Sequence, residues 1–179
     1  HGMMPLPSGN DSLSHLLYVQ HERPDIYERT YKFLEPMDFL IAKLTGTCSA
    51  NLCTAFPLLL TDNRTLASRD YDPELLRLSG VDREKLPDLL PVNAIAGTLR
   101  AELAAELDLP SDTKVFSGVN DTQAAAVGTA TFQGSYGGIN IGTTSQVLAH
   151  VGSKKSDLAN GILSMPSPIA GRYMVMAEN

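Results

Sequence analysis

Hydrophobic residues recur at helical spacing through the first 46 positions of the chain, and helix start and stop signals bracket these runs. Residues 12–21 place leucines on one face of a helix, and Asp11 before them is a favourable N-cap residue. A second helix is expected after Pro24, because proline suits the first helical turn. Residues 36–45 begin with proline and are followed by Gly46, so both signals agree. The pattern therefore predicts three consecutive helices.

The middle of the chain carries shorter patterns that proline and glycine interrupt. The expected elements are a strand over 47–50, a segment over 52–60 capped by Asn51, a helix over 73–80, an extended loop over 86–91, a strand over 95–99 and a helix over 100–107. Residues 114–118 are apolar and rich in β-formers, which predicts a buried strand.

The pattern of hydrophobic and polar residues changes near Gly134. Helical periodicity stops there, and glycines punctuate residues with β-like alternation. Hairpins are therefore expected over residues 135–151 and 162–176. We expect a domain boundary at this point, which divides the chain into residues 1–133 and residues 134–179.

Composition narrows the class of protein. Hydrophobic residues make up 43% of the chain and charged residues 19%, as in a globular protein. The net charge of −6 and a pI near 5.1 argue against a general affinity for nucleic acid or an anionic membrane. No run reaches the roughly 18 apolar residues that a membrane span needs. Any bound phosphate must therefore be held by local contacts.

The cysteines and histidines do not suggest a metal site. Cys48 and Cys53 are the only cysteines, too few for a disulfide framework or a metal site. His15, His21 and His150 lack the spacing of metal ligands, so we expect structural or surface roles for them. We expect both cysteines to be reduced, in a cytoplasmic protein.

An acidic residue stands where the expected strand 114–118 gives way to a helix. Asp121 opens an alanine-rich stretch, and α/β folds place their chemistry at such corners. One interpretation is a helix N-cap, since Asp is among the best residues there. The other is a general base, because an ionised aspartate can accept a proton from an alcohol that attacks phosphorus. The residues alone leave both interpretations open.

A second corner, Gly142-Thr143-Thr144-Ser145, lies between two β-like runs. It is either a β-turn with solvated hydroxyls or a phosphate-binding turn. In the second case the glycine lets the backbone approach a phosphate, and backbone amides and the Thr143 hydroxyl donate to its oxygens. It is not a Walker loop, because no G-x-x-x-x-G-K-[ST] occurs in the chain. Together with Asp121, this turn suggests phosphoryl transfer.

An ordered set of motifs over about residues 12–152 resembles FGGY-family carbohydrate kinases, most like their xylulose kinase branch. The motifs are L-L-Y-V-Q-H-E-R-P at 16–24, L-E-P-M-D-F-L-I-A-K-L-T-G at 34–46, L-P-D-L-L-P at 86–91 with A-G-T-L at 96–99, G-V-N-D-T-Q-A-A-A-V-G at 118–128 and I-G-T-T-S at 141–145. Tyr18 replaces the tryptophan that is usual in the first of them. The ordered set is specific, whereas any one motif could arise by chance.

The resemblance implies an α/β protein with the ribonuclease H-like fold of actin-like ATPases, in which two domains close over ATP and a sugar. It implies ATP-dependent phosphorylation of a sugar hydroxyl, on a ketose such as xylulose or on a related sugar or polyol, with Mg²⁺ as cofactor. Asp121 would be the general base and, with Thr122, would contact the sugar. Gly142, Thr143 and Thr144 would contact the phosphates of ATP.

The chain also departs from the family's pattern. Thr122 stands where relatives often have Asn or Gln, and Asn51 and Cys53 stand where Asp and Ser or Thr are common. The substrate and the sugar contacts of that loop therefore stay open.

Some of the family's parts find no match in the chain. The opening D-x-G-T-type phosphate loop and the adenosine-binding part are both unmatched. The resemblance thus implies a central piece, with the later half of the first domain and the opening strands of the second. We expect that piece to be inactive alone, because half of the phosphate clamp is missing.

An alternative from a different class is a non-catalytic actin-like module that binds a sugar or a partner protein. The altered residues Thr122 and Asn51 leave room for it, whereas Asp121 and Thr143 count against it. The sequence also leaves open which sugar is bound and whether the protein forms a homodimer.

Overall fold

The structure, a computed structural model, describes residues 8–133, 135–142 and 145–178. It begins with three helices, α1 (Ser12–Glu22), α2 (Pro24–Arg29) and α3 (Pro36–Thr45). Asp11 caps α1 by accepting the backbone N–H of Ser14 at 2.9 Å. Gly46 ends α3 in the left-handed conformation, at φ 81°. All three predicted helices are confirmed.

The strands β1 (Ser49–Asn51) and β2 (Asp88–Leu90) pair in parallel. The strand expected over 47–50 is thus confirmed, with its start two residues later and its end one residue later than expected. The extended loop expected over 86–91 is wrong, because its centre is β2. Proline on both sides leaves β2 only three residues to pair with a partner distant in sequence, so no local pattern marks it as a strand.

Residues 52–60 form turns and one short 3-10 helix, η1 (Phe56–Leu58). Asn51 caps this segment as expected, since its Oδ1 accepts the backbone N–H of Cys53 at 2.8 Å. A longer helix does not form, because Leu59 turns into the left-handed region at φ 57°.

The first hydrophobic core lies among α1, α2, β1 and the segments that follow them. Its buried members are Leu16, Tyr27, Ala50, Ala55, Leu58, Leu60, Tyr71, Val81 and Leu86. The helix α4 (Pro73–Ser79) contributes Leu75 and Leu76 to its edge, and the 3-10 helix η2 (Arg83–Lys85) follows. Asp72 caps α4 and Gly80 ends it at φ 70°, which confirms the prediction for this helix.

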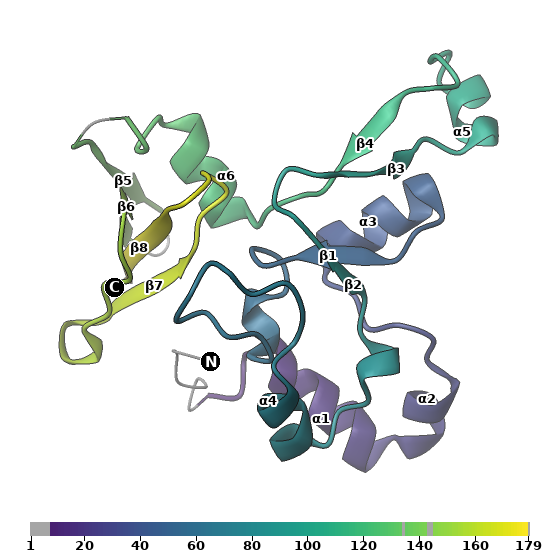
Figure 1. Cartoon of the computed structure of the whole chain (residues 1–179), viewed down its shortest axis with the longest axis horizontal. Coiled ribbons are helices and arrows are strands. Elements are labelled where there is room, and N and C mark those ends of the chain that lie inside the picture. The colour runs from purple at the N-terminus through teal and green to yellow at the C-terminus, as the bar shows by residue number, and fades with distance from the viewer. Residues whose placement is uncertain (1–7, 134, 143–144, 179) are drawn as a thin grey trace.

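The strands β3 (Ile95–Thr98) and β4 (Lys114–Phe116) form an antiparallel pair, with α5 (Ala101–Glu106) between them in sequence. Figure 1 shows this pair beside α3, projecting toward α5. The predicted strand β4 is confirmed, but its expected burial is wrong, since Phe116 is 58% exposed. Its side chains have α3 on one side only, whereas an apolar run in a sequence suggests cover on both faces.

The last part of the chain is a four-stranded antiparallel sheet in the order β5-β6-β8-β7. Its strands are β5 (Gly137–Ile141), β6 (Ser145–Val151), β7 (Ile162–Pro166) and β8 (Tyr173–Glu178), with the 3-10 helix η3 (Leu158–Asn160) before β7. Both predicted hairpins are confirmed. The domain boundary expected at Gly134 stays a prediction, and Gly134 itself lies outside the described residues.

The helix α6 (Asp121–Gly128) packs against this sheet. A second core joins Ala126 of α6 to Leu148, Met165 and Met174 of the sheet and to Phe56 of η1. Figure 1 shows two parts of the chain side by side. The first contains α1 to α5 and β1 to β4, the second contains α6 and β5 to β8, and the segment between β4 and α6 connects them. Asp121 begins the helix at this passage.

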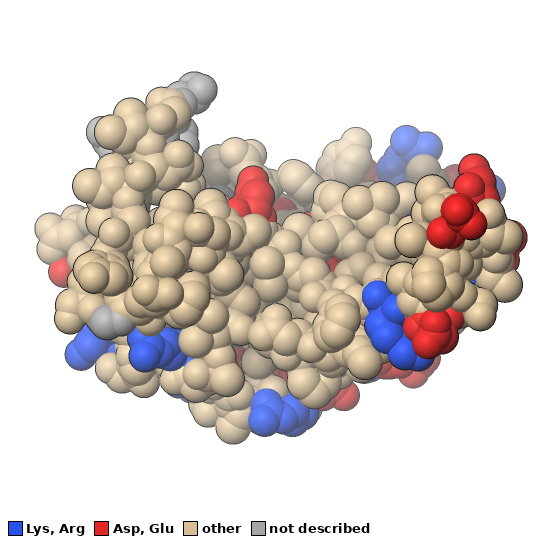
Figure 2. Space-filling model, turned by 90° about the horizontal axis from the view of Figure 1, so that it is seen from above, with Lys and Arg blue, Asp and Glu red and all other residues tan. Residues whose placement is uncertain are grey.

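Charged side chains are scattered over the surface. On the face seen in Figure 2, basic side chains sit in small separate groups, and uncharged residues cover most of the middle. Within the described part of the chain, no helix combines the length and the apolar character needed to cross a bilayer.

Candidate functional site

The first turn of α6 carries Asp121, but Asn120 is the residue that caps the helix. The Asn120 Oδ1 accepts the backbone N–H of Gln123 at 2.8 Å, and the Gln123 side chain accepts the backbone N–H of Asn120 at 3.3 Å. Asn120 has the extended backbone of an N-cap, with φ −71° and ψ 163°, and Asp121 already belongs to the helix. The N-cap interpretation of Asp121 is therefore wrong.

The Asp121 side chain is exposed and remains at the positive end of the helix. Its Oδ1 accepts the backbone N–H of Thr122 at 2.7 Å and lies 3.4 Å from the Thr122 hydroxyl oxygen. These bonds hold one oxygen of the carboxylate, Oδ1. The carboxylate is thus presented at the surface by the backbone of the helix start.

Asn51 holds the chain just before this turn. Its side chain is fully buried, and its Nδ2 donates to the carbonyl oxygen of Gly118 at 2.7 Å. Its Oδ1 accepts backbone N–H groups of the turn that follows β1, from Cys53 at 2.8 Å and from Thr54 at 3.4 Å. One amide therefore joins the end of β1 to the approach to Asp121.

Gln123 holds the chain just after this turn. It is fully buried, and its Nε2 donates to the carbonyl oxygen of Pro166, at the end of β7, at 2.6 Å. The Cys53 Sγ lies 3.6 Å from the same oxygen. Burial raises the pKa of the Cys53 thiol to about 12, although its hydrogen bond with Gln123 lowers it. Cys53 is therefore a neutral structural thiol and not a nucleophile.

A buried carboxyl group, Asp38, lies on α3. It is 1% exposed, and burial raises its pKa from 3.8 to about 7. A hydrogen bond from Thr54 lowers this pKa and the charge of Glu35 raises it. Its Oδ1 has no hydrogen-bond partner among the described residues. The signal for such a group in the sequence is an acidic residue within an apolar helix.

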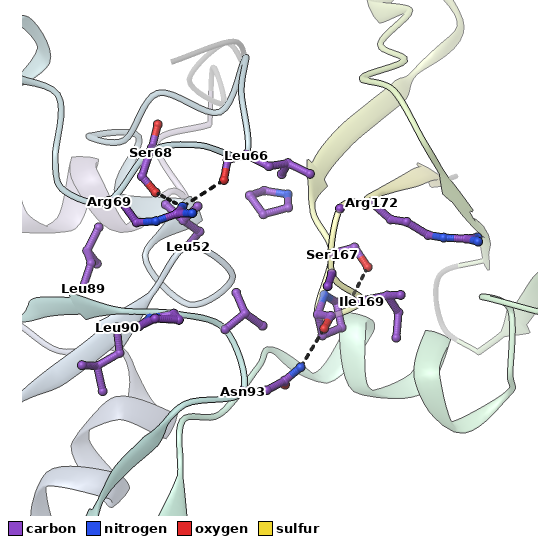
Figure 3. A pocket seen from close by; sticks show the side chains of 16 residues that line it. Leu52, Leu66, Ser68, Arg69, Leu89, Leu90, Asn93, Ser167, Ile169 and Arg172 are labelled. Atoms are coloured by element: carbon purple, nitrogen blue, oxygen red, sulfur yellow. Dashed lines mark hydrogen bonds between the residues drawn. The ribbon is translucent and has the colours of Figure 1, made fainter.

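A pocket of about 210 Å³ opens between residues 66–69, the segment after β2 and the loop 166–172 (Figure 3). Asn93 donates to the carbonyl oxygen of Pro168 at 2.9 Å, and Arg69 donates to backbone carbonyl oxygens of its own loop. Asp121 does not line this pocket. Sequence reasoning missed it, because its walls come from three segments that are far apart in the chain.

The structure describes only some of the other predicted site residues. Gly142 is exposed in the turn between β5 and β6, on the sheet that α6 packs against. Thr143 and Thr144 lie outside the described residues. Thr122 follows Asp121 directly, and its backbone N–H donates to the Asp121 carboxylate. The structure therefore brings Asp121 and Thr122 together at the start of α6.

His150 has the structural role expected for it. It is 7% exposed, and its Nδ1 lies 2.8 Å from the Ser167 hydroxyl oxygen. Burial lowers its pKa and so favours the neutral ring. Throughout the described segments, no three His, Cys, Asp or Glu side chains lie close enough together to hold a metal ion.

Comparison with known proteins places these residues in a family. Residues 4–128, which include Asp121, match the N-terminal domain of the FGGY family of carbohydrate kinases. The chain belongs to this family. The xylulose kinase of Lactococcus lactis is 30% identical over 139 residues, which are 78% of this chain and 27% of that protein. The L-fuculokinase of Salmonella typhi is 29% identical over 69% of this chain and 26% of that protein.

Solved structures agree with this membership. The xylulose kinase of Brucella ovis superposes with a TM-score of 0.83 at 26% identity, over 93% of this chain and 34% of that one. The glycerol kinase of Plasmodium falciparum, at 18% identity and a TM-score of 0.77, shares the fold. The FGGY chain thus has the actin-like ATPase fold of sugar kinases, as expected. It spans about a quarter to a third of the length of the relatives that it matches.

Proposed function

We propose that the protein containing this chain transfers a phosphoryl group from ATP to a hydroxyl group of a sugar or polyol, with Asp121 as the general base. The observation that carries the proposal is the place of Asp121. It is exposed in the first turn of α6, inside the segment that matches the kinase family, while Asn120 performs the capping. A carboxylate that is not needed as a cap is available for chemistry.

The geometry of Asp121 suits a weak base. Its Oδ1 is held by the backbone N–H of Thr122, and the other oxygen can accept the proton of an incoming hydroxyl group. As the hydroxyl oxygen attacks the γ-phosphorus, the bond from that phosphorus to the oxygen bridging it to the β-phosphorus breaks, ADP leaves, and the hydroxyl proton passes to Asp121. Because the transition state of phosphoryl transfer is loose, the hydroxyl group need not lose its proton early. A correctly placed carboxylate is therefore sufficient.

Further site roles belong to the same proposal. Thr122 would contact the sugar, and Gly142, Thr143 and Thr144 would contact the phosphates of ATP. The exposed Gly142 in its turn is compatible with a close approach of phosphate to the backbone. Mg²⁺ would neutralise phosphate charge, but the described side chains offer no cluster of ligands, so the proposal assigns none of them to it.

The relatives suggest which substrates to test. Their names include xylulose kinase, L-fuculokinase and autoinducer-2 kinase. A ketose is the class that we propose, with xylulose first. A cytoplasmic location remains a prediction.

The test uses the full-length protein with ATP, Mg²⁺ and a panel of ketoses, aldoses and polyols. ADP release should depend on one class of sugar, and Asp121→Asn should lower kcat about 100-fold or more. Asp112→Asn is the matched control, an exposed aspartate in the loop before β4, and should leave kcat unchanged. Sugar binding by calorimetry without any product would support a non-catalytic sugar-binding module instead. Near wild-type turnover of Asp121→Asn would remove the base from Asp121.

A further inference from the structure

The side-chain amide of Gln123 is fully buried two residues after Asp121. Its Oε1 accepts the backbone N–H of Asn120 at 3.3 Å, and its Nε2 donates to the Pro166 carbonyl oxygen at 2.6 Å. Both ends of the amide are used, so the group cannot turn over without losing both bonds. Gln123 therefore ties the start of α6 to the end of β7.

A second buried amide holds the other side of the same turn. Asn51 donates to Gly118 at 2.7 Å and is itself fixed by two backbone N–H groups of the turn after β1. The turn that carries Asp121 is thus anchored to the first part of the chain at Gly118 and to the sheet at Asn120. These two anchors belong to different parts of the fold, so the position of the turn depends on both of them.

The hydrogen bonds of the Asp121 carboxylate go to Thr122, its neighbour in sequence. The place of the carboxylate therefore follows the backbone of the turn, and the buried amides determine where that backbone lies. A catalytic group that moves by about 1 Å can lose about 100-fold in rate. An amide that holds this backbone in place can then affect catalysis without touching the substrate.

We propose that Gln123 is a positioning residue for the phosphoryl transfer proposed above, and that it acts through Asp121. This inference rests on the proposed function. Removal of the amide should lower kcat by about tenfold to 100-fold and change the KM for the sugar little. A role in stability alone would lower the folded fraction and leave kcat per folded site unchanged.

Two variants of the full-length protein test the inference. Gln123→Met keeps the length of the side chain and loses both hydrogen bonds. Gln123→Glu keeps the acceptor for Asn120, and in its protonated form it can still donate to the carbonyl oxygen of Pro166. The control is Gln133→Met, the same substitution at an exposed position. Each variant is also made in the Asp121→Asn background, with kcat referred to the folded fraction.

Four results are expected. Gln123→Met lowers kcat, Gln133→Met does not, and Gln123→Glu retains more activity than the Met variant near pH 6 and loses that advantage as the pH rises. In the Asp121→Asn background, Gln123→Met lowers the residual kcat no further, because the group through which it acts is gone.

Other results would overturn the inference. Equal loss in both backgrounds, or a wild-type kcat for Gln123→Met, excludes positioning through Asp121 while leaving the proposed function intact. A wild-type protein that phosphorylates no sugar removes the proposed function itself, and the positioning role with it. The activity of the wild-type protein separates these two cases.

Discussion

The Oδ1 of Asn120 accepts the backbone N–H of Gln123 at 2.8 Å, and this bond places the helix cap one residue before Asp121. Asp121 therefore does not cap the helix. Stability and catalysis in this turn should then depend on different side chains.

The first prediction separates these two roles. Asn120→Ala removes the side-chain acceptor of the capping box and should cost about 1 kcal/mol of stability. Asp121→Asn keeps the cap and loses only its charge near the helix dipole, so it should cost about 0.5 kcal/mol at most. Thermal unfolding of the full-length variants measures both. A larger loss for Asp121→Asn than for Asn120→Ala would contradict this assignment of the cap.

The second prediction concerns the pH dependence of stability. Because burial raises the pKa of Asp38 to about 7, the folded protein keeps a proton between about pH 4 and pH 7 that the unfolded chain releases. Stability from this group is therefore greatest below pH 4, falls through that window and is constant above it, by an amount on the order of a few kcal/mol.

Asp38→Asn tests this, because an amide does not ionise. Whatever its cost at low pH, the variant should lose less stability than the wild type between pH 5 and pH 8. Denaturant unfolding at a series of pH values gives the two slopes, and Asp112→Asn serves as an exposed control. Parallel curves for wild type and Asp38→Asn would show that Asp38 does not titrate in this range.

Local signals predicted much of the fold, and long-range contacts account for the errors. The helix α1 was predicted from Asp11 and the spacing of its leucines, and α3 and α4 were predicted from the proline and glycine that bracket each of them, all of which are local signals. The strand β2 was missed because it exists only through its pairing with β1.

The candidate site shows the same division. Asp121 was found from its corner and its motif. Gln123 was not recognised as an anchor, because its partner Pro166 lies 43 positions away, and the partner of Asn51 lies 67 positions away. The capping box formed by Asn120 and Gln123 can be predicted from the sequence alone, since a polar N-cap followed three residues later by Gln is its signature.

The third prediction concerns the contact between α3 and β3. A Cβ added at Gly97 would lie 2.9 Å from the Cβ of Thr45, an atom that the helix backbone fixes. The Thr45 hydroxyl donates to the Ile41 carbonyl oxygen at 2.8 Å, which further holds its side chain. Gly97→Ala should therefore destabilise the protein by about 1 to 3 kcal/mol.

Gly128→Ala is the matched control. Nothing lies within 4 Å of a Cβ added there, and the residue ends a helix, where alanine is favourable. Thermal unfolding should show a lower midpoint for Gly97→Ala and an equal or higher one for Gly128→Ala. An unchanged midpoint for Gly97→Ala would mean that α3 and β3 are not in close contact.

The fourth prediction concerns the two thiols, which share one tryptic peptide, residues 44–64. Cys53 is fully buried with a pKa raised to about 12, so at pH 8 it is neutral and out of reach of a reagent. Cys48 is partly exposed. Brief treatment of the native protein with iodoacetamide should add one label to this peptide, and treatment in denaturant should add two.

Cys48→Ser identifies the labelled thiol, because this variant should yield an unlabelled peptide from the native protein and a singly labelled one after unfolding. The same experiment reports on the junction at the Pro166 carbonyl oxygen, which both the Cys53 thiol and the Gln123 amide contact. If Gln123 holds this junction closed, Gln123→Met in the Cys48→Ser background should speed the labelling of Cys53, while Gln133→Met should not. Equal rates in the two variants would mean that the junction stays closed without the amide, and that any loss of kcat in Gln123→Met arises closer to Asp121.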